Sequence, residues 1–186
     1  MKPCLKPCLI AAALTTLAFA GVEDYASARR KLDLIDSDRL RPGAKVTLTA
    51  RELNAFVAHE VPPGVRDTKL QIVSPGVATG SALVDFGKVR RAQGHPPGWL
   101  MSKLLDGERP VSVTARIASG NGRAKVKVER VQVSGVEIDG KTLDFLVQNL
   151  LLPLYPNAAV DRPFQLGHRI ERLEVEPAAI GIVIGR

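Results

Sequence analysis

The side chains that could do chemistry are few in this sequence of 186 residues. Its three histidines, His59, His95 and His168, are far apart, and His59-Glu60 is not followed by a second histidine at zinc-protease spacing before a proline pair ends the helix. No nucleophile elbow, phosphate-binding loop or dinucleotide fingerprint occurs in the chain. The carboxylates are scattered along the outer faces of predicted strands, which is typical of solvated surface. The sequence therefore predicts a protein that is not an enzyme and that holds no metal or cofactor.

The first twenty residues, MKPCLKPCLIAAALTTLAFA, have the three parts of a secretory signal peptide. Two lysines precede an apolar stretch over residues 8–17, and Ala18-Phe19-Ala20 fits an A-x-A cleavage site. We predict residues 1–20 as the signal peptide and residues 21–186 as one domain, periplasmic or secreted, that is soluble or peripheral to a membrane. The alternative is an uncut N-terminal anchor, which the short apolar stretch disfavours.

Cysteine and charge content narrow the partners of the exported domain. Both cysteines, Cys4 and Cys8, lie within the predicted signal peptide, so the remaining chain has no disulfide or cysteine metal site. Loss of Lys2 and Lys6 lowers the formal net charge from +7 to +5. Outside the cytoplasm this balance favours anionic lipid head groups, envelope polyanions or no specific partner over nucleic acid. The oligomeric state is not set by the sequence.

The sequence of the N-terminal part of the domain predicts two helices and a strand. Residues 23–40 have near-helical apolar spacing among many charges, which indicates a surface helix. Residues 45–48 read as a short strand, and Thr49 with Glu52 forms an S/T-x-x-E capping box for a helix that ends before Pro62.

Residues 70–133 predict antiparallel strands. One strand pair surrounds the turn at 74–76, and its second strand continues to Phe86. A further strand over 111–117 alternates apolar and polar residues and reaches an SGNG hairpin turn. In the returning strand the alternation shifts at Arg130, which predicts a β-bulge and a strongly curved sheet.

The C-terminal part contains the most apolar segment of the domain, LDFLVQNLLLPLYP over residues 143–156. Its leucines and valine recur at the spacing of one helical face, but the segment is too short to cross a bilayer. An irregular link over 156–167 and a last pair of strand segments over 173–184 follow. Helices and hairpins in this order, without βαβ spacing, predict an α+β fold.

Two segments resemble small exported bacterial proteins related to the TULIP lipid-binding superfamily. They are GRAKVKVERVQVSGVEIDGKTLDFLVQNLL and FQLGHRIERLEVEPAAIGIVIG, in which a strand leads through a short turn into an amphipathic helix and then a final strand pair. The earlier LTARELNAFVA is similar to a helix start in some periplasmic lipoproteins with a related architecture, although this chain lacks their lipid-modified cysteine. The resemblance implies a curved antiparallel sheet wrapped around a long apolar helix, with a second N-terminal helix and acyl chains held between sheet and helix.

Two interpretations of the apolar segment follow, a lipid-filled groove and an ordinary packed core. In the first, acyl chains contact the helix and the facing strands; the lining residues are then Leu143, Phe145, Leu146, Val147, Leu150 and Leu151 with Val111, Val113, Ile117, Val126 and Val128. In the second, the same side chains pack only on each other. The first predicts a lipid-binding or lipid-handling protein, the second a non-enzymatic envelope interaction module with a filled core.

A basic stretch beside a tryptophan supports the lipid interpretation. Lys88, Arg90 and Arg91 precede a Pro-Pro-Gly loop, and Trp99 and Leu100 follow it. Tryptophan next to aliphatic residues and cations suits the head-group boundary of an anionic bilayer, or a flap over the mouth of a groove. The alternative is a short helix that packs its apolar side on the sheet beneath a solvated basic loop.

Overall fold

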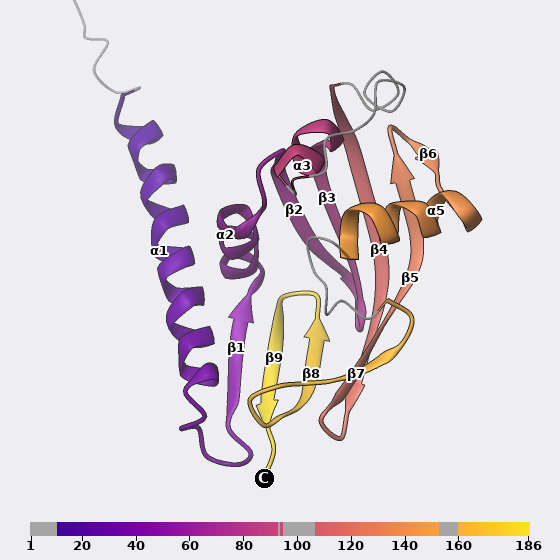
Figure 1. The fold of residues 1–186 in the computed structure, drawn as a ribbon. Helices are drawn as coiled ribbons and strands as arrows, with labels where there is room; N and C mark the ends of the chain where they lie inside the picture. Colours follow the sequence, from indigo (N-terminus) through magenta and orange to yellow (C-terminus); the bar gives the residue numbers. More distant parts are fainter. Residues whose placement is uncertain (1–10, 93, 95–106, 153–159) are drawn as a thin grey trace, which may run out of the picture.

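The computed structural model describes residues 11–92, 94, 107–152 and 160–186. It confirms an α+β fold and antiparallel strand pairing (Figure 1). Two sheets form. The three-stranded sheet has the order β1-β9-β8, and the larger sheet has the order β2-β3-β4-β5-β6, with β7 paired to β5. The strand bounds are Lys45–Thr49 (β1), Val65–Ser74 (β2), Val77–Asp85 (β3), Glu108–Gly120 (β4), Arg123–Val133 (β5), Val136–Glu137 (β6), Pro163–Gln165 (β7), Ile170–Glu176 (β8) and Ala179–Ile184 (β9).

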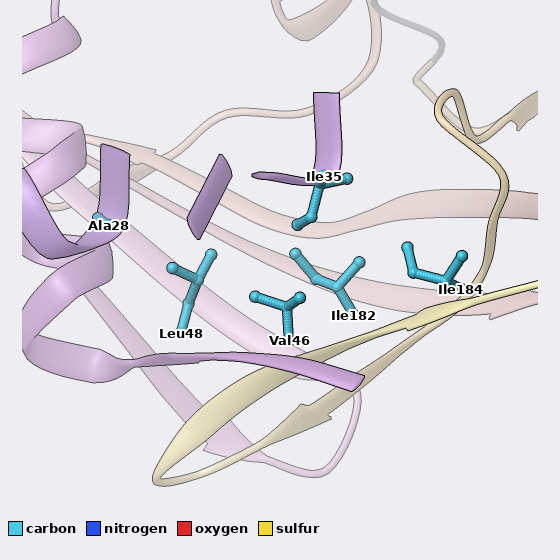
Figure 2. Close-up of a cluster of buried hydrophobic side chains, with 6 residues drawn as sticks. All are labelled: Ala28, Ile35, Val46, Leu48, Ile182 and Ile184. Carbon is cyan, nitrogen blue, oxygen red and sulfur yellow. The ribbon is translucent and has the colours of Figure 1, made fainter. Parts of the chain in front are cut away.

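Helix α1 (Ala11–Asp36) covers the small sheet. It contributes Ala28 and Ile35, which pack on residues of β1 and β9 (Figure 2). The six buried side chains of this cluster, called the small-sheet core below, are Ala28, Ile35, Val46, Leu48, Ile182 and Ile184. The segment predicted as a surface helix therefore supplies part of a core.

Helix α2 (Ala50–Glu60) begins at the predicted capping box. The Thr49 hydroxyl accepts a hydrogen bond from the Glu52 backbone N–H at 3.3 Å, and the Glu52 carboxylate accepts one from the Thr49 N–H at 2.8 Å. The helix ends at Glu60, because Pro62 and the residue before it favour an extended backbone. Both the cap and the end point of the predicted helix are confirmed.

Glu52 also ties α1 to α2, which the capping pattern did not reveal. Its side chain is buried, and it accepts hydrogen bonds from Lys31 Nζ at 2.7 Å and Ser27 Oγ at 2.6 Å. Burial raises the pKa of Glu52, but the hydrogen bonds from Lys31, Ser27 and Thr49 outweigh it and lower the pKa from 4.5 to about 2. The carboxylate is thus ionised and fully partnered inside the protein.

The large sheet contains the predicted bulge. Thr114 pairs with Arg130 and Ala115 pairs with Val128, so Glu129 is the extra residue in β5. The SGNG hairpin between β4 and β5 is confirmed as well, with Asn121 and Gly122 both at positive φ.

Three features of the large sheet differ from the prediction. Phe86 does not extend the strand but begins helix α3 (Phe86–Ala92), because the Asp85 side chain accepts a hydrogen bond from the Lys88 backbone N–H at 2.8 Å and caps a helix there. The link over 156–167 contains β7, which pairs with the edge of β5. The short β6 was also not predicted.

The apolar segment forms helix α5 (Gly140–Leu146), which continues as the π-helical turn η1 (Val147–Leu151). α5 lies across β4 and β5 on one face of the large sheet (Figure 1). The predicted wrapping of a curved sheet around a long helix is not confirmed.

Candidate functional site

An apolar cavity of about 250 Å³ lies between the large sheet and its helices. Its described lining residues come from the large sheet, from α3, from α5 with η1, and from Val160. The ribbon shows α5 in front of β4 and β5 (Figure 1). All described residues around it are apolar: Val65, Val84, Phe86, Val89, Val111, Val113, Val128, Val131, Val133, Leu143, Leu146, Val147, Leu151 and Val160. We call this space the large-sheet cavity.

Cross-strand pairs of valines form the floor of the cavity. Val111 pairs with Val133, and Val113 pairs with Val131. Beyond the bulge the next inward residue of β5 is Val128. If β5 ran through Glu129 as a regular strand, Val131 and Val133 would point to the opposite face from Val128, because side chains alternate along a strand. The bulge therefore keeps one continuous apolar face along β5.

Helix α3 places two apolar side chains at one end of the cavity. Phe86 and Val89 line the space and are themselves buried, with Val89 only 2% exposed. They form a small cluster with partly buried neighbours from β2, β3, β4, β5 and α5. On the sheet floor, Val131 is a third buried residue of the described lining.

The covering helix presents four of its apolar residues to the cavity, namely Leu143, Leu146, Val147 and Leu151. The last two belong to the π-helical turn, where each turn holds more residues than in an α-helix. Such turns occur frequently at functional sites. Here the turn lies directly over an unfilled space.

A second hollow of about 240 Å³ continues from the cavity across the same face of the sheet toward α2. It shares Val84, Val111 and Val113 with the large-sheet cavity and reaches Val57 on α2. Thr68 also lines it, and its Oγ1 is the one buried side-chain polar atom without a hydrogen-bond partner in the described part of the chain.

The predicted lipid-contact residues divide into three groups. Seven line the cavity, namely Val111, Val113, Val128, Leu143, Leu146, Val147 and Leu151. Three do not line it, namely Phe145, Ile117 and Val126. The Phe145 side chain is 42% exposed, and Ile117 and Val126 pair with each other nearer the hairpin between β4 and β5. The side chain of Leu150 lies outside what the structure describes.

The predicted membrane-contact residues are only partly described. Lys88, Arg90 and Arg91 lie on α3, beside the cavity end that Phe86 and Val89 occupy. Trp99 and Leu100 lie outside the described residues. The alternative interpretation, a short apolar helix packed on the sheet beneath a solvated basic loop, concerns residues that lie largely outside the described ranges, and the three basic residues themselves lie on a helix.

Several lining residues were missing from the predicted set. In the sequence Val131 and Val133 have the opposite parity to Val128, and combining the predicted bulge with the strand pairing brings them to the same face. Phe86, Val89 and Val84 were recognisable only as apolar residues near a strand end. Val65 and Val160 carry no sequence signal that singles them out.

The described lining of the cavity offers apolar surface for burial and carries no reactive group. Across the described ranges, no three histidine, cysteine or acidic side chains gather in a way that could hold a metal ion. Within the same ranges, no helix has both the length and the apolar character needed to cross a bilayer. Comparison with family models, curated proteins and solved structures finds no match for this chain.

Proposed function

We propose that this protein is exported and binds a single acyl chain in the large-sheet cavity, as a lipid-binding or lipid-handling protein. The observation that carries the proposal is a cavity of about 250 Å³ whose described lining is entirely apolar. Protein interiors are packed nearly as densely as organic crystals, so a space of this size is unusual in a packed core. A dry apolar cavity is the environment that a hydrocarbon chain prefers to water.

The size of the cavity suits one hydrocarbon chain. An engineered apolar cavity of about 150 Å³ holds benzene, so by proportion the large-sheet cavity holds about ten carbon atoms. Burial of ten methylenes contributes about 8 kcal/mol before the cost of ordering the chain. The second hollow, which shares three valines with the cavity, provides room for a longer chain to continue toward α2.

Enclosure of the chain between sheet and helix is part of the same proposal. The bulge at Glu129 and the π-helical turn of η1 let the strand and the helix present one apolar surface each to the same space. In this arrangement the ligand completes a core that the protein leaves open.

Export is the second part of the proposal. The predicted cleavage site, between Ala20 and Gly21, falls within α1, and the described contacts of Ser27, Ala28 and Lys31 follow it. Cleavage would therefore leave the contacts of Ser27, Ala28 and Lys31 intact. N-terminal sequencing of secreted protein should begin at Gly21, and recovery of an intact N-terminus in a membrane pellet would contradict export.

Lipid content tests the binding itself. Native mass spectrometry of protein purified without detergent should show bound lipid, and Leu146→Trp should fill the cavity and yield a folded protein without lipid. Phe145→Trp is the matched control, because Phe145 is adjacent on the helix but does not line the cavity. It should retain the lipid.

A different result would favour the interaction module with a filled core. If the parent protein carries no lipid and Leu146→Trp fails to fold, the space is occupied by the protein itself and the lipid proposal is wrong.

A further inference from the structure

Arg109 lies one step beyond the apolar floor of the large-sheet cavity. On β4, Val113 and Val111 line the cavity, and Arg109 follows them on the same face because side chains alternate along a strand. The pairing of β3 with β4 is regular from Val77 to Asp85, and it places Arg109 opposite Val84, which also lines the cavity. The apolar row thus ends in a guanidinium group.

This guanidinium has no protein partner in the part of the chain that the structure describes. Arg109 is exposed and takes part in no hydrogen bond or ion pair there. An arginine with its full charge at the end of an apolar row attracts an anion and can bind a carboxylate or phosphate in a bidentate manner.

The acidic groups near this end are occupied by other cations. Asp85 lies 3.4 Å from Lys88 Nζ, and Glu108 accepts a hydrogen bond from Arg66 Nε at 2.8 Å. On the neighbouring strands, Glu137 lies 3.5 Å from Arg130. Because these carboxylates are paired, none of them neutralises Arg109, and α3 adds further positive charge beside it.

We infer that the ligand is a single-chain amphiphile with an anionic head group, whose carboxylate or phosphate binds Arg109 while its chain follows Val111 and Val113 into the cavity. This inference rests on the proposed acyl-chain binding and specifies the chemical class of the ligand and its orientation. The head group remains beside the exposed Arg109, where water solvates the oxygens that Arg109 leaves free.

A comparison of head groups on the same chain tests the inference. Binding of dodecanoic acid, dodecanol and dodecanoyl lysophosphatidic acid should be measured with the parent protein and with Arg109→Gln. The parent protein should bind the two anions at least tenfold more tightly than the alcohol, on the scale of one charge-assisted interaction. Arg109→Gln should remove this difference and leave alcohol binding unchanged, whereas Arg109→Lys should retain part of it.

Lys127→Gln is the matched control. It removes the same charge from the next strand, but Lys127 pairs with Arg116 on the opposite face from the cavity. It should bind all three ligands as the parent protein does. An equal loss of anion binding in Lys127→Gln would show that net charge, not Arg109, is responsible.

The outcomes separate the two proposals. If the acid and the alcohol bind equally and Arg109→Gln changes neither affinity, the head-group assignment is wrong while acyl-chain binding stands. If no ligand binds, the proposed function fails and the inference fails with it. The two anions compared with each other show whether carboxylate or phosphate fits better.

Discussion

The small-sheet core and the large-sheet cavity use similar apolar side chains but pack them differently. In the first, α1, β1 and β9 bring leucine and isoleucine side chains together until almost no surface remains exposed (Figure 2). In the second, only Phe86, Val89 and Val131 are buried among the described lining residues, and the others are partly exposed to a space of about 250 Å³.

The comparison indicates that side-chain length determines whether the space between a sheet and its covering helix is filled. Ten of the fourteen residues around the cavity are valines, which are too short to bridge the space between a sheet and a covering helix. The small-sheet core instead places Leu48, Ile35, Ile182 and Ile184 at its centre. An apolar face alone therefore does not make a core, because the facing residues must also reach each other.

The largest expected effect is the loss of a side chain from the filled region. Leu48→Ala should lower the free energy of unfolding by about 3–4 kcal/mol, because the side chain is 4% exposed and its removal leaves an empty space between α1 and β9. Urea denaturation at neutral pH measures this loss. A loss below about 1 kcal/mol would mean that the small-sheet core is not tightly packed.

The second effect depends on pH and tests the buried carboxylate beside the small-sheet core. Because the folded pKa of Glu52 is lowered from 4.5 to about 2, ionised Glu52 stabilises the fold above pH 4.5, and this contribution is lost as the pH falls from 4.5 to 2. The shift corresponds to roughly 3 kcal/mol. The free energy of unfolding, measured by urea denaturation at a series of pH values from 4.5 down to 2, should therefore fall more steeply with decreasing pH for the parent protein than for Glu52→Gln. Parallel pH dependences would contradict the assignment.

The third effect is the same truncation made in the hollow region. Leu146→Ala should cost no more than about 1.5 kcal/mol, because Leu146 already borders an empty space and its removal enlarges a cavity instead of creating one. The same urea experiment, performed beside Leu48→Ala, gives the comparison directly. Equal losses in the two variants would show that both regions are filled.

The smallest effect should be a gain in stability. Thr68→Val replaces a buried hydroxyl that has no hydrogen-bond partner with a methyl group of similar shape, so it should stabilise the protein by about 0.5–1 kcal/mol. Thermal unfolding of lipid-free protein measures it. A destabilised variant would indicate that the Thr68 hydroxyl has a partner in solution.

Local patterns predicted most of the elements. The capping box at Thr49, the hairpin at Asn121 and the bulge in β5 each depend on residues close in sequence, and all three are confirmed. The α+β class followed from the order of these elements. The cavity residues that the sequence indicated on α5 and β4 were likewise predicted from local patterns, namely helical spacing and strand alternation.

Features that depend on distant residues were not predicted. The division into two sheets requires β1 to pair with β9, although Lys45 and Val183 are 138 positions apart, and no local signal reports this pairing. Phe86 is an example of a residue for which the local pattern predicts the wrong element. Its alternation with Val84 favours a strand, but Asp85 caps a helix, and Phe86 is the first residue of α3. Whether Leu146 faces a cavity or a core depends on the length of the side chains opposite, which belong to other strands.

The pairing of β1 with β9 also sets the time at which this protein can fold. Lys45 lies opposite Val183, so β1 can pair only after a further 138 residues have been synthesised. Closing such a long loop is slow and cannot begin before β9 has been synthesised. The N-terminal segment will therefore remain without its sheet partner during synthesis, and a chain in this state can still be threaded through a narrow translocation channel.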